Sequence, residues 1–378
     1  MRLTKTYTCW LLSPVIVIIS LLMFALSHRS QSFAAWYAAN LYPILPHTIG
    51  RFFSLFPFSV FEIVLILLVL LSIYGVSFFV ISLCTSKGRA RLWCWAKTYA
   101  STTLRRMMNI AAILVLFFVL GAGINYNRES YAEHVGIVVQ ESPVDELIQL
   151  YMILVERAEL VAPLINTDAN DRFVFQSDNV HNDAGRAMME LNDLHGGLIS
   201  YFPRAKGWLL SRQVLSNMQI AGVFTPWTME GNYNADMPAQ SIPFVIVHEL
   251  AHVAGHMRED EANFIAYLAA RNVDNVDFNY SAVYTALSYT LNALRRSLSA
   301  QQHSELFAML PEQLQRDFAA AREYWQAFEG PVADMSTRMN DAYLRMNQQE
   351  DGVQSYGRMI DLLLAYYRND NRIVRNRY

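Results

Sequence analysis

The chain has 378 residues, 53% of them hydrophobic, with 30 basic and 33 acidic side chains. The charge is unevenly divided: residues 1–124 hold ten basic residues and one acidic residue, a net +9, whereas residues 125–378 hold twenty basic and thirty-two acidic residues, a net −12. The acidic second part argues against nucleic-acid binding, which requires a basic face. The length allows a membrane part plus one sizeable domain.

Three apolar stretches in the first part predict membrane-spanning helices. The first stretch also resembles a signal peptide, because Arg2 and Lys5 precede it and Ala25 and Ser27 resemble a cleavage site. An uncleaved anchor is the simpler interpretation, since two more spans follow. Almost no ionisable residue lies within the spans, which indicates an anchor and not a channel or transporter. The stretches are Trp10–Leu26, Val60–Cys84 and Ile110–Ile124.

The loops between these stretches predict the orientation of the chain. Six basic residues and no acidic residue lie between the second and third spans, so the positive-inside rule places this loop and the N-terminus in the cytoplasm. The aromatic loop Ser27–Ser59, expected to lie at the membrane interface, and everything after about residue 125 are then outside. We therefore expect a multi-pass protein of the bacterial inner membrane with its larger domain outside the cytoplasm. The six basic residues are Lys87, Arg89, Arg91, Lys97, Arg105 and Arg106.

The second part contains no cysteine, because Cys9, Cys84 and Cys94 all precede residue 125. A disulfide framework and a cysteine metal site are thus not expected there. Helix-start signals begin at Ser142, which is followed by Pro143. Besides the stretch treated next, helices are predicted over Ser142–Leu160, Asn182–Leu194, Phe278–Leu298, Gln302–Leu310, Pro311–Phe328, Pro331–Met346 and Tyr356–Tyr367. Short strands are predicted over Phe173–Phe175, Trp208–Leu210, Ile220–Thr225 and Thr228–Tyr233.

The most informative stretch holds His248, Glu249 and His252 in the pattern H-E-x-x-H, after the apolar run Ile242–Val247. On a helix, residues four apart lie on the same face, so both imidazoles can bind one metal ion. Glu249 lies beside them, placed to reach a water on that ion and poorly placed to bind it. This is the arrangement of a zinc hydrolase with an open metal position. The alternative is a buried amphipathic helix with incidental histidines.

A second helix is predicted over Glu259–Ala270, after a turn at Gly255. It is expected to supply the third metal ligand. Glu259 is favoured, because the small Ala262 and Asn263 share its face and Asn263 could hydrogen-bond a ligating histidine. Glu261 remains an alternative, although its face carries large apolar residues, and His256 on the turn is a further one.

These residues carry a family resemblance. HELAH followed by Glu-x-x-Ala-Asn resembles the gluzincin metallopeptidases, which implies that the glutamate of that second motif, here Glu259, is the third zinc ligand. The wider pattern is similar to a bacterial membrane family labelled domain of unknown function 3810, and it covers most of the chain. The resemblance implies a membrane-tethered, zincin-like fold, in which an edge strand beside the active helix pairs with extended substrate. Gly222–Asn234 is the candidate for that strand, although a plain hairpin fits equally well. The matching blocks are Phe56–Ser59, Thr225–Asn234, the HELAH motif, Glu259–Phe264 and Gly352–Tyr367.

The sequence thus predicts an α-helical membrane anchor of three spans over residues 1–124, and a mainly α, zincin-like α+β domain over residues 125–378. We expect Zn²⁺ on His248, His252 and Glu259, with Glu249 as the base that activates a water in the fourth position to hydrolyse a peptide bond. The expected partners are the lipid bilayer and a membrane or extracytoplasmic polypeptide. Two alternatives are a zinc hydrolase of a non-peptide amide or ester, and a non-catalytic scaffold or binding protein. Tyr356 and Arg358 are either oxyanion donors or a capped helix start.

Overall fold

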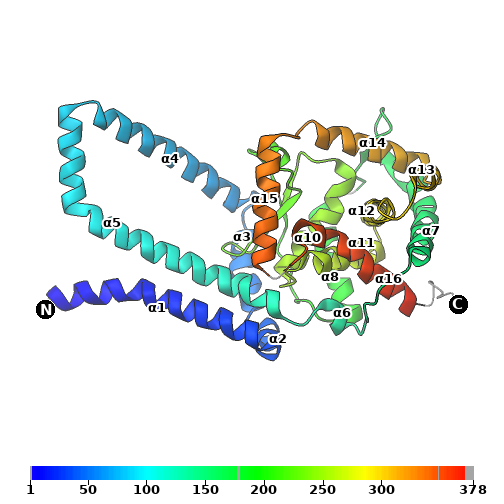
Figure 1. Ribbon diagram of the computed structural model, residues 1–378, viewed down its shortest axis with the longest axis horizontal. Helices are drawn as coiled ribbons and strands as arrows, with labels where there is room; N and C mark the ends of the chain where they lie inside the picture. The colour runs from blue at the N-terminus through cyan, green and yellow to red at the C-terminus, as the bar shows by residue number, and fades with distance from the viewer. Residues whose placement is uncertain (1, 177–178, 348, 371–378) are drawn as a thin grey trace.

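The computed structural model describes residues 2–176, 179–347 and 349–370, which form three long apolar helices projecting from one side of a mainly helical domain (Figure 1). Each long helix contains a stretch that is long and apolar enough to cross a membrane. All three stretches expected from the sequence are therefore helical, and their composition suggests that the chain associates with a membrane. The long helices are α1 (Arg2–Arg29), α4 (Val60–Leu83) and α5 (Ser86–Gly121).

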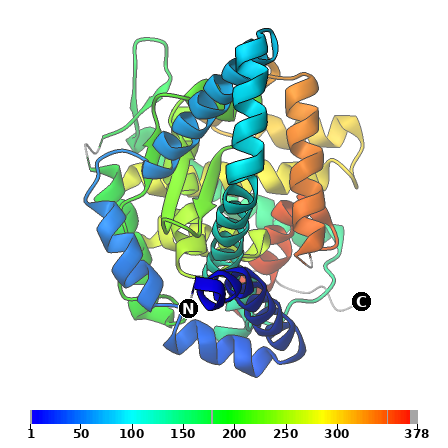
Figure 2. The ribbon, with the colours of Figure 1, turned by 90° about the vertical axis from the view of Figure 1, so that its left-hand side faces the viewer.

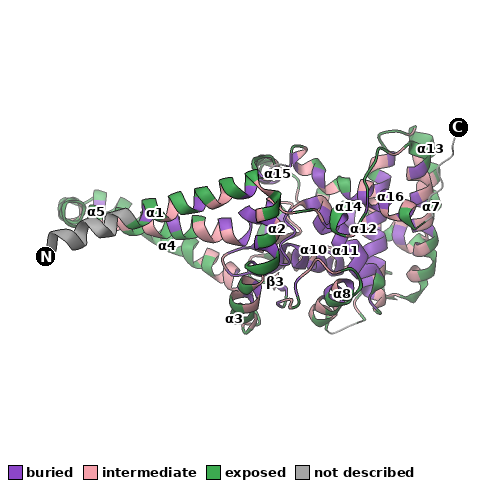
Figure 3. Cartoon of the chain, turned by 90° about the horizontal axis from the view of Figure 1, so that it is seen from below, coloured by how far each residue is buried: buried purple, intermediate pink, exposed green. Residues whose placement is uncertain are grey.

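The three long helices pack unequally. α1 lies along the second half of α5, whereas α4 runs apart from α1 and joins α5 at the end far from the domain (Figures 1 and 2). α4 has only two buried residues, Glu62 near its start and Ser82 near its end. Between them its apolar side chains are largely exposed, as the exposure colours of Figure 3 show.

The basic segment between the second and third spans is helical, where the sequence analysis expected a loop. α5 begins after Thr85, whose hydroxyl accepts a hydrogen bond from the N–H of Gly88 (3.0 Å). The segment is rich in Ala, Lys, Arg and Leu, which favour helix, so the helix continues from the basic half into the apolar half. The 36 residues of α5 correspond to about 54 Å along the helix axis, which bends sharply in its first half (Figure 1) and exceeds the ~30 Å of a hydrocarbon core. Its basic half can therefore extend beyond a bilayer that the apolar half crosses.

The segment between α1 and α4 connects the long helices to the domain. Tyr37 and Tyr42 are buried in a small core formed with Val119 of α5, Ile124 of the 3-10 helix that follows it, and Met257 of the domain. The Tyr42 hydroxyl donates a hydrogen bond to the carbonyl oxygen of Val253 (2.9 Å), and the Tyr37 hydroxyl donates one to that of Leu120 (2.8 Å). This segment, expected to be an interfacial loop, is folded as α2 (Gln31–Asn40), a π-helix (Pro46–Gly50) and α3 (Arg51–Ser54).

The domain is built around α10 (Ile242–Val253) and α11 (Glu259–Asn272), which are almost entirely buried (Figure 3). α10 contacts α8, α11, α12 and the small sheet, so most of its surface is covered. The first half of α10, Ile242–Val247, is apolar. This composition suits a buried helix, because the burial of apolar side chains contributes most to the stability of the folded protein. The surrounding helices are α6 (Tyr131–His134), α7 (Val144–Val161), α8 (Val180–His195), α9 (Arg212–Asn217), α12 (Val276–Leu294), α13 (Ala300–Ala308), α14 (Glu312–Gln326), α15 (Pro331–Met346) and α16 (Met359–Asn369). Short 3-10 helices cover Gly123–Asn127, Ala162–Leu164, Ala239–Ser241 and Gly352–Arg358.

A three-stranded sheet covers one side of α10. Its order is β3-β5-β4, with β3 parallel and β4 antiparallel to the central β5. β4 pairs from Gly222 opposite Tyr233 to Thr225 opposite Glu230, and it forms an edge of the sheet within the described residues. The strands are β3 (Lys206–Trp208), β4 (Gly222–Thr225) and β5 (Glu230–Asn234), and a separate pair is formed by β1 (Asn166–Thr167) and β2 (Phe173–Val174).

The elements expected from the sequence are present in the domain, with their ends shifted by a few residues. One difference affects the site: Tyr356 was expected at the head of the last α-helix. The structure instead places it in the 3-10 helix Gly352–Arg358, and α16 begins only at Met359. Gly352 has φ +55°, a left-handed conformation that glycine adopts without strain and that separates this segment from α15.

A candidate metal centre

Helix α10 places the side chains of the H-E-x-x-H motif. Pro243 lies in its first turn, where the missing N–H breaks no hydrogen bond. After the helix, Gly255 at φ +89° reverses the chain, as the sequence predicted, so that α11 returns against α10. The two histidines and the glutamate of the motif are all buried.

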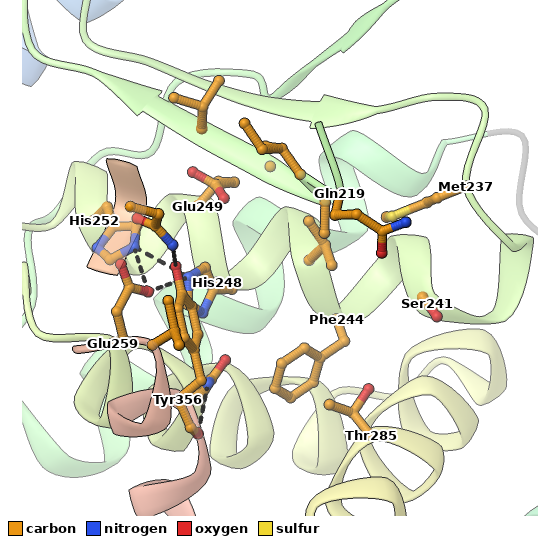
Figure 4. Close-up of a pocket in the computed structure, with 18 of the residues that line it drawn as sticks. Gln219, Met237, Ser241, Phe244, His248, Glu249, His252, Glu259, Thr285 and Tyr356 are labelled. Atoms are coloured by element: carbon orange, nitrogen blue, oxygen red, sulfur yellow. Dashed lines mark hydrogen bonds and ion pairs between the residues drawn. The ribbon is translucent and has the colours of Figure 1, made fainter. Parts of the chain in front are cut away.

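Three ligand atoms from the two helices converge on one point (Figure 4). The Nε2 atoms of His248 and His252 lie 3.1 Å apart, and Oε2 of Glu259 lies 3.2 Å and 3.5 Å from them. Zinc bonds of about 2.0–2.2 Å at tetrahedral angles place ligand atoms about 3.3–3.6 Å apart. The three distances fit a site of that size, and this buried cluster could hold a metal ion.

A second contact prepares His252 to bind a metal. Its Nδ1 lies 2.7 Å from the carbonyl oxygen of His256, which can only accept a hydrogen bond. Nδ1 therefore carries a proton, and Nε2 faces the cluster as the atom that would bind a metal once its own proton is released. A backbone carbonyl in this position is a usual partner of a metal-bound histidine. Asn263 lies next to His248, but its amide donates to the carbonyl oxygen of Tyr356 (3.1 Å), and Nδ1 of His248 has no hydrogen-bond partner among the described residues, so the hydrogen bond to a ligating histidine that the sequence suggested is not formed.

The electrostatics of the metal-free cluster resemble an ion pair. Burial raises the pKa of the Glu259 carboxyl, but the two imidazoles outweigh this effect and bring the pKa to about 2. Burial lowers the pKa of His252, but Glu259 raises it to about 9. For His248 burial dominates and lowers the pKa. An anionic carboxylate beside two imidazoles is a donor set suited to a divalent cation.

Glu249 occupies a different position, between the cluster and the sheet (Figure 4). A Cβ added to Gly222 of β4 would come within 2.2 Å of its Oε1, and one added to Gly231 of β5 within 3.0 Å of its Cβ. Its Oε2 is buried and has no hydrogen-bond partner among the described residues. Burial raises the pKa of this carboxyl to about 8. A buried carboxyl without a partner beside a candidate metal site is an arrangement typical of a proton-transfer group.

The alternative ligands lie elsewhere. Glu261 forms an ion pair with Arg258, accepts a hydrogen bond from the N–H of Tyr131 (3.2 Å) and lies 3.4 Å from Nδ1 of His256. Nε2 of His256 lies 3.2 Å from the carbonyl oxygen of Gly197. Both residues belong to a buried polar cluster on the far side of α11, and neither side chain joins the three ligand atoms.

Of the two suggested oxyanion donors, the structure brings only one to the site. The Tyr356 ring packs near His248, with ring centroids 6.5 Å apart. Arg358 is exposed and forms an ion pair with Asp351. Sequence reasoning did not identify the other tyrosines around the site, because they come from separate segments without a local pattern. They are Tyr126, Tyr289 and Tyr343.

The cluster lies at the wall of a large cavity of about 1060 Å³. The whole of β4 lines it, opposite Tyr284 and Tyr289 of α12. The cavity also reaches the long helices, through Phe61 of α4 and Phe118 of α5. It is large enough for several residues of an extended chain.

The model of one protein family, described as protein of unknown function (DUF3810), matches residues 37–364. The matched range includes the second and third long helices, the sheet, the candidate metal centre and most of α16. No curated protein and no solved structure matches the sequence.

Proposed function

We propose that this chain, which belongs to the DUF3810 family, is a membrane-anchored zinc metallopeptidase of the gluzincin type. One observation carries the proposal: His248, His252 and Glu259 converge at zinc-like separations while Glu249, buried and without a partner, lies beside them. An incidental pair of histidines on a buried helix would not explain a carboxylate from a second helix at the same point.

Zinc is the ion that suits these residues. Two neutral imidazoles and one carboxylate are a common catalytic zinc set that leaves a fourth position open. Calcium and magnesium prefer six or more oxygen ligands, which the described residues around the cluster do not supply. When bound, zinc would polarise a substrate carbonyl and lower the pKa of a water from 15.7 to about 7.

Glu249 would move the protons. Its carboxylate would accept a proton from the attacking water and deliver it to the nitrogen of the leaving amine. Burial raises the pKa of Glu249 to about 8 in the metal-free site, and a divalent cation close by would lower it, because a positive charge favours the carboxylate. Gly222 and Gly231 leave the side chain the room to occupy this position.

A polypeptide substrate is favoured by β4. The strand is an edge of the sheet in the described part of the chain, and all its residues line the cavity. An extended peptide can add to such an edge through main-chain hydrogen bonds, an interaction that an ester or an isolated amide cannot repeat along a strand. The position of β4 beside Glu249 would bring a paired peptide bond to the candidate centre.

The three long helices would anchor the enzyme in the bacterial inner membrane. The basic half of α5 would lie in the cytoplasm by the positive-inside rule, which places the domain outside. The domain would then act on polypeptides at the outer surface of that membrane.

The proposal is tested by metal removal and return. The purified full-length protein should contain about one zinc ion per chain, and a chelator should abolish peptide hydrolysis until zinc is restored. Hydrolysis that is unaffected at a zinc content near zero would contradict the proposal. A zinc-loaded protein that hydrolyses esters but no peptide would replace it with the non-peptide alternative.

A further inference from the structure

We infer that the substrate is itself anchored in the membrane and reaches the cavity sideways, along α4, so that it is cut close to the bilayer. This inference rests on the proposed peptidase function and names its substrate class. Four independent features of the described residues support it.

The first feature is the position of the cavity. Its lining includes Phe61 in the first turn of α4, Phe118 and Ala122 at the end of α5, and also His248 and Glu249. The same hollow therefore joins the candidate centre to two membrane-type helices. A binding site for soluble peptides does not require lining residues from the ends of membrane-type helices.

The second feature is the turn between β4 and β5, which is fixed to both of these helices. The indole Nε1 of Trp227 donates a hydrogen bond to the carbonyl oxygen of Leu114 (3.1 Å), inside the apolar stretch of α5. Its ring stacks on Phe61, with centroids 6.1 Å apart and planes 18° from parallel. Tryptophan is favoured at membrane interfaces, where its apolar ring and polar N–H are both satisfied. This turn, which follows the edge strand β4, is therefore held against the apolar half of α5 and the start of α4.

Two carboxylates fix the start of α4 to the sheet and to the segment that follows β3. Glu230 of β5 accepts hydrogen bonds from the N–H groups of Val60 and Phe61 (both 3.0 Å) and forms a buried ion pair with Lys206 (2.6 Å). Glu62 accepts from the N–H of Ser211 (2.7 Å). Charge-assisted bonds to a helix start are among the stronger contacts of a protein, so the position of α4 beside the cavity is firmly set.

The third feature is the uncovered apolar surface of α4. Between Glu62 and Ser82 no residue of this helix is buried, whereas α1 and α5 cover one another. Figure 1 shows α4 running apart from α1 along most of its length, and its contacts with α5 are fewer than those between α1 and α5. Within a bilayer, such a helix offers a packing surface for another apolar helix, and one packed there would direct its outer end into the cavity.

The fourth feature is a row of exposed apolar side chains on α15. Val332, Met335, Met339 and Met346 lie on one face at helical spacing and are 58–82% exposed. Met339 also lines the cavity, and Tyr343 of the same helix is hydrogen-bonded to Tyr126 just after α5 (3.0 Å). Methionine side chains are flexible and pack against many different apolar partners. This row is therefore suited to an apolar polypeptide segment of variable sequence near the membrane.

The test compares anchored and free forms of the same peptides. The zinc-loaded full-length protein is placed in vesicles of phosphatidylethanolamine and phosphatidylglycerol. One peptide pool carries a randomised segment next to a polyleucine span, and the other carries the same segment next to a Gly-Ser linker. New N-termini are counted by mass spectrometry. We expect cleavage of the anchored pool to exceed that of the free pool by about 10²-fold or more, the gain that confinement to one surface provides.

Variants of α15 make the test specific. Met335→Lys and Met339→Lys should reduce cleavage of the anchored pool at least about tenfold, because a charge among these side chains must be desolvated. Met152→Lys, at an exposed methionine of α7, is the matched control and should cleave both pools as the wild type does. Equal cleavage of both pools by the wild type would overturn the inference and leave the peptidase intact. Cleavage of neither pool would refute the peptidase itself, and release of fatty acids from the vesicles instead would point to a lipid substrate.

Discussion

Gly222 of β4 lies directly against the carboxylate of Glu249, so closely that a Cβ at position 222 would come within 2.2 Å of Oε1. The edge strand and the candidate base are therefore in contact. In the proposed mechanism a peptide paired with the strand would be presented to the base, and a change in the strand would reach the base without altering the candidate metal ligands.

This contact predicts the effect of Gly222→Ala. The added methyl group should displace the Glu249 carboxylate, while His248, His252 and Glu259 remain in place. We expect normal zinc content and a fall in peptide hydrolysis of about 10–10² fold, because a base that is misplaced by about 1 Å loses much of its effect. Gly185→Ala in α8 is the control, since a Cβ there meets nothing within 4 Å. Full activity of Gly222→Ala would show that Glu249 does not need its observed position.

The two glutamates of α11 should respond differently to substitution. Glu259→Ala should lose zinc, as should His248→Ala and His252→Ala, because three protein ligands are the usual minimum of such a site. Glu261→Gln should retain zinc and lower the free energy of unfolding by about 1–3 kcal/mol. The substitution removes the negative charge of a buried side chain that pairs with Arg258 and accepts a hydrogen bond from the N–H of Tyr131. Zinc analysis and thermal unfolding of the purified proteins measure both effects. Loss of zinc from Glu261→Gln, with retention in Glu259→Ala, would reverse the assignment.

The membrane orientation can be measured separately from the chemistry. Reporter domains fused after Trp95 and after Val135 should lie on opposite sides of the membrane, the first in the cytoplasm and the second outside. The physical reason is the excess of basic residues in the first half of α5. A cytoplasmic signal from the fusion after Val135 would place the domain inside and remove extracytoplasmic substrates from consideration.

His181 predicts part of the acid sensitivity of the fold. Burial, with a smaller effect from Arg204, lowers the pKa of this imidazole from 6.5 to about 4. The unfolded chain therefore binds a proton at His181 before the folded protein does, so the stability falls as the pH decreases from about 6.5 to 4. Thermal unfolding of the wild type and of His181→Gln at pH 7 and pH 5 measures the effect. The variant should lose less stability over this interval, by about 1 kcal/mol. An identical loss in both proteins would assign the acid sensitivity to other groups.

The local pattern was sufficient to predict much of the centre. The i, i+4 spacing of His248 and His252 places them together on any helix, and the small residues on the face of Glu259 correctly indicated which glutamate returns to them. Helix ends were predictable where a glycine turn enforces them, as at Gly255. These features depend on residues close to one another in the chain.

The remaining features depend on distant residues and could not be predicted from the sequence. Trp227 meets Leu114 across 113 positions, and Glu230 meets Val60 across 170. No local period in the sequence indicates such contacts. The sequence analysis also expected a loop where the basic segment forms the first half of α5. A run of basic residues indicates which side of a membrane a segment lies on, but it does not exclude a helix.

The central claim is that Glu249 transfers protons and does not hold the fold or the metal. The most direct measurement compares wild type with Glu249→Gln at matched zinc content, on the peptide pool that the wild type cleaves. The glutamine fills the same space between β4 and the imidazoles, so zinc content and thermal unfolding should be unchanged. Turnover should fall by about 10²–10⁴, the usual contribution of a positioned acid–base group. Equal rates of cleavage by the two proteins would contradict this account.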